Sequence, residues 1–160
     1  MVLLELAPEI AAIGDDEILH LPETARHDLE KAKARLRDGD LSGAIGAACA
    51  AVDSATADVF KRRQLGDPSD TSFQERVNRA LRSHGVIPRL ERNLTAIGWE
   101  AETARRLREN LAGSMNQAAF VMQTFRAKMG DAHGTQAVLE PLVYDSLKWA
   151  ALIVRLLDEA

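Results

Sequence analysis

The segment from Arg126 to His133 carries the residue types that could do chemistry in this chain. It runs Phe-Arg-Ala-Lys-Met-Gly-Asp-Ala-His-Gly, and its two glycines, Gly130 and Gly134, allow the backbone to fold tightly. A histidine can accept the proton of a ribose 2′-hydroxyl or protonate the leaving oxygen, and an arginine can neutralise the charge that develops on phosphorus. Arg126 and His133 could therefore cleave RNA without a metal ion. A plainer interpretation stays open, in which Asp131 and His133 only cap helix ends.

The remaining reactive residue types do not form a recognisable site. No two of the four histidines flank a carboxylate at the spacing of a zinc motif, and one cysteine, Cys49, cannot form an internal disulfide. Glycine-rich phosphate loops and nucleophile elbows are absent from the sequence. We therefore expect no metal site and no cofactor. His20, His27 and His84 are expected at the surface or at helix ends, and Cys49 is expected to be a small buried hydrophobe.

Composition and periodicity predict that the scaffold holding these residues is all-α. Hydrophobic residues make up 46% of the chain but aromatic residues only 4%, a balance that favours close-packed helices over strands. Caps, turns and apolar spacing predict helices over 22–37, 41–64, 72–85, 88–97, 100–128 and 141–157. The predicted fold is a helical bundle of about five to six helices. The apolar repeat from Ala104 through Leu107 to Phe125 indicates that the longest helix packs on a core.

The chain length fits a single helical domain over 1–160, with 1–21 as an N-terminal lead segment and 22–158 as the bundle. The longest strongly apolar stretch, Trp149 to Val154, is too short to cross a bilayer, and no signal peptide is recognisable. These features predict a cytoplasmic protein with no membrane partner. The last helix is apolar on nearly every side, which indicates either full burial or one half of a subunit interface.

Charge is distributed unevenly along the chain. The net charge of −4 argues against bulk nucleic-acid binding, yet residues 61–110 contain eleven bases and seven acids. The arginines that could contact an RNA backbone there are Arg76, Arg79, Arg82, Arg105 and Arg106. A solvated helix face is the alternative interpretation.

The Arg126–Gly134 segment resembles the motif of the Abi-C (abortive infection C-terminal) domain, within the larger HEPN group of helical proteins. That motif runs L-R-N-x-x-G-x-x-H-G and is followed by a long apolar helix. The upstream order is also similar, with Gly39-Asp40, an alanine-rich helix carrying Asp53, and an arginine-bearing helix that leads to Ser83-His84-Gly85. The resemblance covers roughly residues 22–158.

The resemblance implies a helical bundle, often dimeric, of the kind found in phage defence and toxin–antitoxin systems. It assigns Arg126 and His133 as the catalytic pair of a metal-independent endoribonuclease that leaves 2′,3′-cyclic phosphate ends, with two copies of the pair facing each other across a homodimer seam. Asp53 would orient Arg126. Ala127 stands where the family usually has a polar residue. The alternative is a non-catalytic dimerisation or interaction module whose partner is an antitoxin or another defence protein.

Overall fold

A computed structural model describes residues 13–130 and 137–158, and this part of the chain is helical with no strand. The seven α-helices and one 3-10 helix are α1 (Asp15–Ile18), α2 (Glu23–Arg37), α3 (Leu41–Arg63), η1 (Pro68–Asp70), α4 (Phe73–His84), α5 (Val86–Ala96), α6 (Ala101–Met129) and α7 (Glu140–Leu157). The all-α prediction is confirmed, but the expected count of five to six helices is too low. The additional helix, α1, is a single turn in the lead segment, too short to produce an apolar repeat in the sequence.

Local capping explains why the helices begin where they do. The Asp40 carboxylate accepts a hydrogen bond from the Gly43 amide at 2.9 Å and starts α3, and the Ser72 hydroxyl accepts from the Glu75 amide and starts α4. One expected boundary differs. Gly85 has a positive φ of 76° that ends α4 and begins α5 directly, so α5 starts at Val86, two residues before the expected start at Pro88. Pro88 is still tolerated, because it lies in the first turn of the helix.

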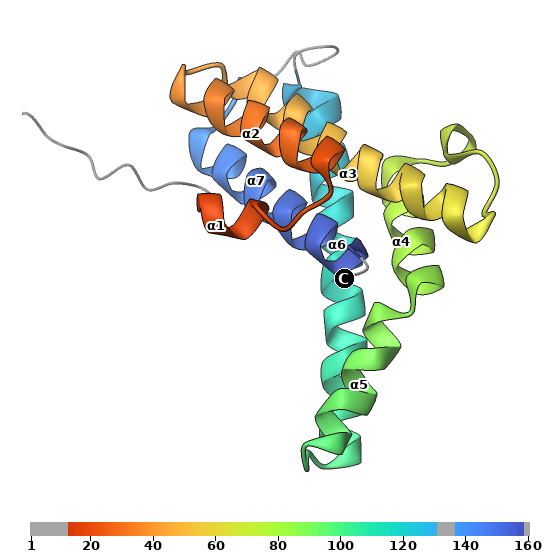
Figure 1. Ribbon diagram of the computed structural model, residues 1–160. Helices are drawn as coiled ribbons and strands as arrows, with labels where there is room; N and C mark the ends of the chain where they lie inside the picture. The colour runs from red at the N-terminus through yellow and green to blue at the C-terminus, as the bar shows by residue number, and fades with distance from the viewer. Residues whose placement is uncertain (1–12, 131–136, 159–160) are drawn as a thin grey trace, which may run out of the picture.

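The core lies where α2, α3 and α7 pack against one another (Figure 1). Alanine-rich α3 lies at the centre and contacts both of its neighbours closely, and the α7 side chain Leu147 is fully buried beside it. The lead segment contributes as well, because Ile13, Ile18 and Leu21 are buried in the same core. The inner face of α7 is thus covered within one chain, but the helix is not fully buried, because Trp149, Leu152 and Leu156 stay partly exposed.

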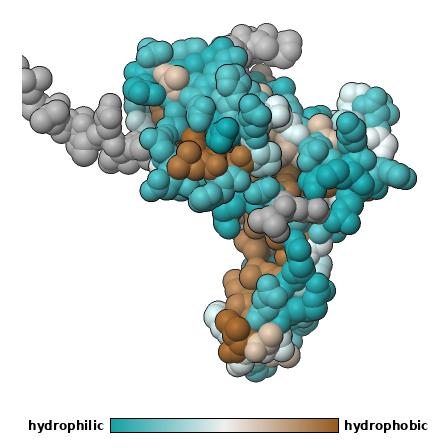
Figure 2. Space-filling view, in the orientation of Figure 1, coloured by the Kyte–Doolittle hydropathy of each residue, from teal (hydrophilic) through white to brown (hydrophobic). Residues whose placement is uncertain are grey.

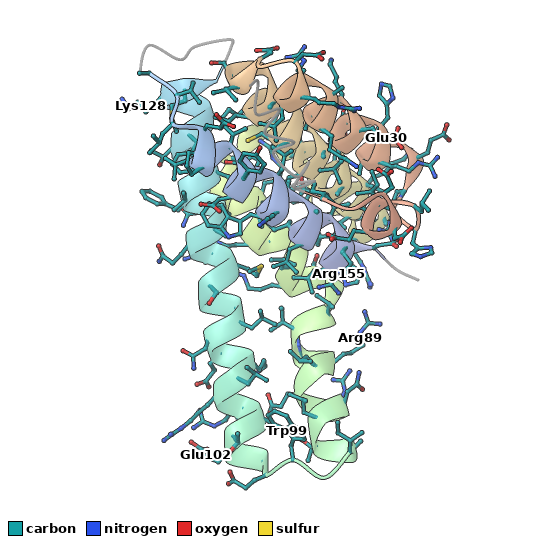
Figure 3. The ribbon with its side chains drawn as sticks, turned by 90° about the vertical axis from the view of Figure 1, so that its left-hand side faces the viewer. Glu30, Arg89, Trp99, Glu102, Lys128 and Arg155 are labelled. Carbon is teal, nitrogen blue, oxygen red and sulfur yellow. The ribbon has the colours of Figure 1, made fainter. Side chains whose placement is uncertain are left out.

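A helical hairpin projects from this core. Helix α5 and the first half of α6 run side by side away from the rest of the molecule (Figures 1 and 3). We call residues 86–114 the arm and the remaining described residues the head. Ile87 and Ala104 are the arm's buried residues in α5 and α6. Leu107, which the apolar repeat placed in a core, is 41% exposed because no third helix covers this part of α6.

No helix in residues 13–130 and 137–158 combines the length and the apolar character that crossing a bilayer requires.

Candidate functional site

The centre of the candidate site is a carboxylate on α3 that joins three helices. The Asp53 Oδ2 accepts a hydrogen bond from Arg126 Nη1 of α6 at 2.7 Å, and the Asp53 Oδ1 accepts one from Arg76 Nη1 of α4. One carboxylate thus holds two guanidinium groups, and the group of three carries a net charge of +1. The side chain of Asp53 is 25% exposed and that of Arg126 is 46% exposed, so the arginine reaches the surface while its carboxylate partner is largely covered.

Arg76 is anchored on a second side by the loop after α3. Its Nε donates to the carbonyl oxygen of Pro68 and its Nη2 to that of Thr71, each at 3.2 Å. Together with the contact to Asp53, these hydrogen bonds use all three nitrogens of a side chain that is only 17% exposed. Arg76 therefore fixes the position of Asp53, and Asp53 in turn fixes Arg126. The sequence offers no signal for this pairing, because residues 53 and 76 lie on different helices.

Gly130 of the motif has a steric role at the end of α6. Its amide donates to the Arg126 carbonyl oxygen at 3.2 Å and closes the last turn of the helix. A Cβ atom added to Gly130 would clash with that same carbonyl oxygen. The helix predicted over 100–128 ends one residue later, at Met129, with Gly130 as its cap. A close backbone approach explains the glycine there, because the φ of −70° is open to any residue.

Cys49 lies one turn before Asp53 on α3. The residue is fully buried, and its Sγ approaches the Met122 carbonyl oxygen at 3.9 Å. Burial raises the pKa of the Cys49 thiol to about 12, against a lowering by the positive charge of Arg126. The thiol is thus protonated at neutral pH, which confirms the expected role as a small buried hydrophobe rather than a nucleophile.

The other candidate arginines lie in different surroundings. Arg79 donates to the Leu65 carbonyl oxygen at 2.8 Å and lies 5.2 Å over the Phe60 ring, whereas Arg82 is exposed on α4. Arg105 and Arg106 are paired with Glu102 on the arm, about 30 Å along α6 from Arg126. The structure brings Asp53, Arg76 and Arg126 together and leaves Arg105 and Arg106 remote from them.

Three residues of the motif, Asp131, His133 and Gly134, lie outside the described residues, so the distance between Arg126 and the histidine is not part of the structure. His84 was expected at the surface or at a helix end. It is the last residue of α4, which confirms the helix-end alternative, and it is buried, with 5% of its surface exposed. Among the described residues, no group of three or more histidine, cysteine, aspartate or glutamate side chains could hold a metal ion.

A polar cluster that sequence reasoning missed joins α4 to α6. The Asn116 Oδ1 accepts hydrogen bonds from the Gln74 amide side chain at 2.8 Å and from Asn78, and the Gln74 backbone amide donates to Gln123. These amides hold α6 in a defined rotation against α4. Because Arg76 and Arg126 lie on the same two helices, the cluster also helps to set their separation.

Comparison with protein-family models, with curated proteins and with solved structures finds no significant match to this chain.

Proposed function

We propose that this chain is a HEPN-like, metal-independent endoribonuclease of the phage-defence or toxin type, with Arg126 and His133 as its catalytic pair. The observation that carries the proposal is the shared carboxylate, because Asp53 holds Arg126 on one side while Arg76 holds Asp53 on the other. An arginine that is fixed before substrate arrives stabilises developing negative charge at little cost in reorganisation. The motif that resembles the Abi-C pattern begins at this arginine.

Chain connectivity is compatible with the pair acting together. Arg126 and Gly130 are one helical turn apart, and His133 follows Gly130 by three residues, which reach at most about 11 Å. This short separation along the chain supports a shared role for the two side chains at one phosphate group.

The proposed reaction is an internal transfer at phosphorus. The ribose 2′-oxygen attacks the adjacent phosphate, the bond from phosphorus to the 5′-oxygen breaks, and the products are a 2′,3′-cyclic phosphate and a 5′-hydroxyl. The proton of the 2′-hydroxyl ends on the leaving 5′-oxygen, and His133 serves one of these two proton transfers. Arg126 stabilises the extra negative charge on the phosphate oxygens in the transition state.

The test is cleavage of mixed cellular RNA in EDTA by the wild type, by Arg126→Ala and by His133→Ala. We expect the wild type to cut and each variant to lose about 100-fold or more of the rate. Lys128→Ala is the matched control, because Lys128 is an exposed cation two residues from Arg126 on the same helix. The 5′-hydroxyl ends should accept phosphate from a polynucleotide kinase without prior phosphatase treatment. Cleavage that EDTA abolishes, or that both alanine variants retain, would contradict the mechanism.

A non-catalytic interaction module is the second candidate function. Ala127 supports it, because the family's polar side chain next to the arginine is missing here. The exposed apolar residues Ile97, Trp99 and Phe120 support it as well, since proteins associate through exposed apolar surface. In this case a homodimer, an antitoxin or another defence protein would be the partner, and folded wild-type protein would leave RNA intact. Unfolding of His133→Ala would also favour this reading, since catalytic residues are usually dispensable for folding.

A further inference from the structure

The outward side of α5 is positively charged. Residues 76–96 include five arginines and one acid, Glu91, in a chain whose net charge is −4. The Glu91 carboxylate faces the other helix of the arm, where its Oε2 lies 2.6 Å from Arg108 Nε. Arg89 and Arg92 are exposed and three residues apart on α5, and neither forms an ion pair within the part of the chain that the structure describes. Figure 3 shows Arg89 on the side of α5 that faces away from α6.

Two further arginines lie near the start of α5. Arg82 is in the last turn of α4, which turns directly into α5 at Gly85, and Arg155 is in the last turn of α7. The end of α7 lies beside the start of α5 in both views, and Arg155 and Arg89 are on the same side of the molecule (Figures 1 and 3). Arg82 and Arg155 are exposed, and neither pairs with a carboxylate among the described residues. We call Arg82, Arg89, Arg92 and Arg155 the basic junction, because they lie where the arm leaves the head.

The other exposed residues of α5 are small or polar. They are Pro88, Asn93, Thr95 and Ala96, and the large exposed hydrophobic residues of the described chain lie outside α4 and α5. In Figure 2 the apolar side chains of the arm gather on one side, and hydrophilic side chains cover the other. Protein–protein interfaces have an apolar centre with charges at the rim. Separate cations without an apolar centre instead fit the phosphates of a nucleic-acid backbone, whose oxygens match the guanidinium fork.

We propose that the basic junction binds the sugar–phosphate backbone of an RNA strand at a distance from the phosphate that reacts. This inference rests on the proposed ribonuclease function and adds the class of substrate to it. The Glu91–Arg108 ion pair places Arg89 and Arg92 beside residue 108 of α6, and Arg126 lies eighteen residues farther along that helix, about 27 Å away. One strand of a nucleic-acid helix has a phosphate about every 3.4 Å, so about eight nucleotides separate the two regions. The preferred substrate is therefore an RNA longer than about eight nucleotides, of any sequence, because phosphate contacts do not read bases.

Four of the five arginines selected from the sequence already have protein partners. Arg76 and Arg79 donate to the α3 carboxylate and to carbonyl oxygens of the following loop. Arg105 and Arg106 are paired with Glu102 on the arm. An RNA phosphate would have to replace those partners, whereas on the outward side of α5 it displaces water.

The first experiment measures binding of an RNA that cannot be cleaved. A 2′-O-methyl RNA of about twelve nucleotides has blocked 2′-oxygens and is longer than the span between the two regions. Fluorescence anisotropy over a salt series gives the slope of the logarithm of the binding constant against the logarithm of salt concentration. For the double variant Arg89→Ser with Arg92→Ser, we expect this slope to be smaller by about 1.4, because each phosphate contact to a single strand contributes about 0.7.

The matched control is the double variant Arg105→Ser with Arg106→Ser. It removes the same charge from the other helix of the arm, where both arginines are paired with Glu102. Its salt slope should equal that of the wild type. Circular dichroism checks that each variant is folded.

Cleavage separates binding at the basic junction from chemistry at Arg126. On unmodified RNA of the same length, the Arg89→Ser/Arg92→Ser variant should lose about tenfold in kcat/KM, through a higher KM with kcat unchanged. A dinucleotide is too short to reach the basic junction, so the wild type and this variant should cleave it at equal rates.

Two results would overturn the proposal. One is a salt slope that the Arg89→Ser/Arg92→Ser variant shares with the wild type. The other is equal binding of a polyglutamate chain, because the basic junction would then fit an acidic protein rather than RNA. A wild type that binds the RNA, with the expected loss in the variant, but cuts no RNA would support the basic junction and refute the ribonuclease, so the two proposals fail separately.

Discussion

The head and the arm share one helix, α6, but bury very different amounts of apolar surface. In the head, α6 packs against α3, α4 and α7, and Met115, Ala119 and Met122 join the core. In the arm the same helix has α5 as its neighbour, and Ala104 is its one buried residue there. Helix formation therefore does not depend on burial around the whole circumference. A neighbour on one side, good helix formers and the continuous hydrogen-bond ladder of α6 extend the helix beyond the core.

The difference also explains where a fixed polar site can form. The Asp53 carboxylate lies in the head, largely covered, and binds two arginines from other helices. Glu102 in the arm likewise binds two arginines, Arg105 and Arg106, but all three are exposed neighbours on one helix. The ion pairs of Asp53 connect three helices. The ion pairs of Glu102 are screened by water and connect residues of one helix only.

The largest difference is expected from shortening a leucine in each region. Leu147→Ala in the head should lower the free energy of unfolding by about 2–5 kcal/mol, because it leaves a cavity in a fully buried site. Leu107→Ala in the arm should change it by less than about 0.5 kcal/mol, since that side chain is 41% exposed. Urea unfolding followed by circular dichroism measures both. Equal losses would show that the arm belongs to the same packed core as the head.

The next largest difference is expected from neutralising the two bridging acids. Asp53→Asn should cost about 1–3 kcal/mol, because it weakens two contacts to charged groups and leaves Arg76 partly buried without a carboxylate. Glu102→Gln should leave thermal stability unchanged within error, since its ion pairs are exposed. Thermal unfolding at low and high salt checks this pair. A large loss of thermal stability for Glu102→Gln that disappears at high salt would mean that surface ion pairs stabilise the arm.

The smallest difference, and one of opposite sign, is expected from two helical glycines. Gly113→Ala should raise the free energy of unfolding by up to about 1 kcal/mol, because alanine is the better helix former and the space around Gly113 is open. Gly43→Ala in the head should give no such gain, because the new methyl group would displace the Asp40 carboxylate that caps α3. Urea unfolding followed by circular dichroism compares both variants with the wild type. Stabilisation by Gly43→Ala would show that this cap contributes little.

Much of the fold follows from local sequence signals. Asp40 and Ser72 are cap residues followed by apolar spacing, so the starts of α3 and α4 were predictable within a residue or two. Exposure in the arm was not predictable, because Leu107 belongs to the same periodic repeat as the buried Met122. Periodicity tells which side of a helix is apolar, but it does not tell how many helices are present to cover that side.

The candidate site was predictable only in part. Arg126, Asp53 and Gly130 could be selected because a family motif and helix-end chemistry mark them. The role of Arg76 could not be found in that way, because its contacts to Asp53, Pro68 and Thr71 depend on how α4 and a loop pack on α3. Arginines spaced three apart look the same in sequence whether they face water or another helix. Tertiary contacts alone distinguish Arg76 from the exposed Arg82.

Because α6 is one unbroken helix from Ala101 to Met129, it behaves mechanically as a stiff rod with Arg126 near one end. A tilt of only about 5° about its head end would move the arm tip by about 4 Å over a length of about 43 Å. The converse also holds, since a force at Trp99 is applied with a long lever to the contacts that hold Arg126 against Asp53. A partner that binds the tip of the arm therefore exerts a force on the contacts of Arg126 at the other end of α6.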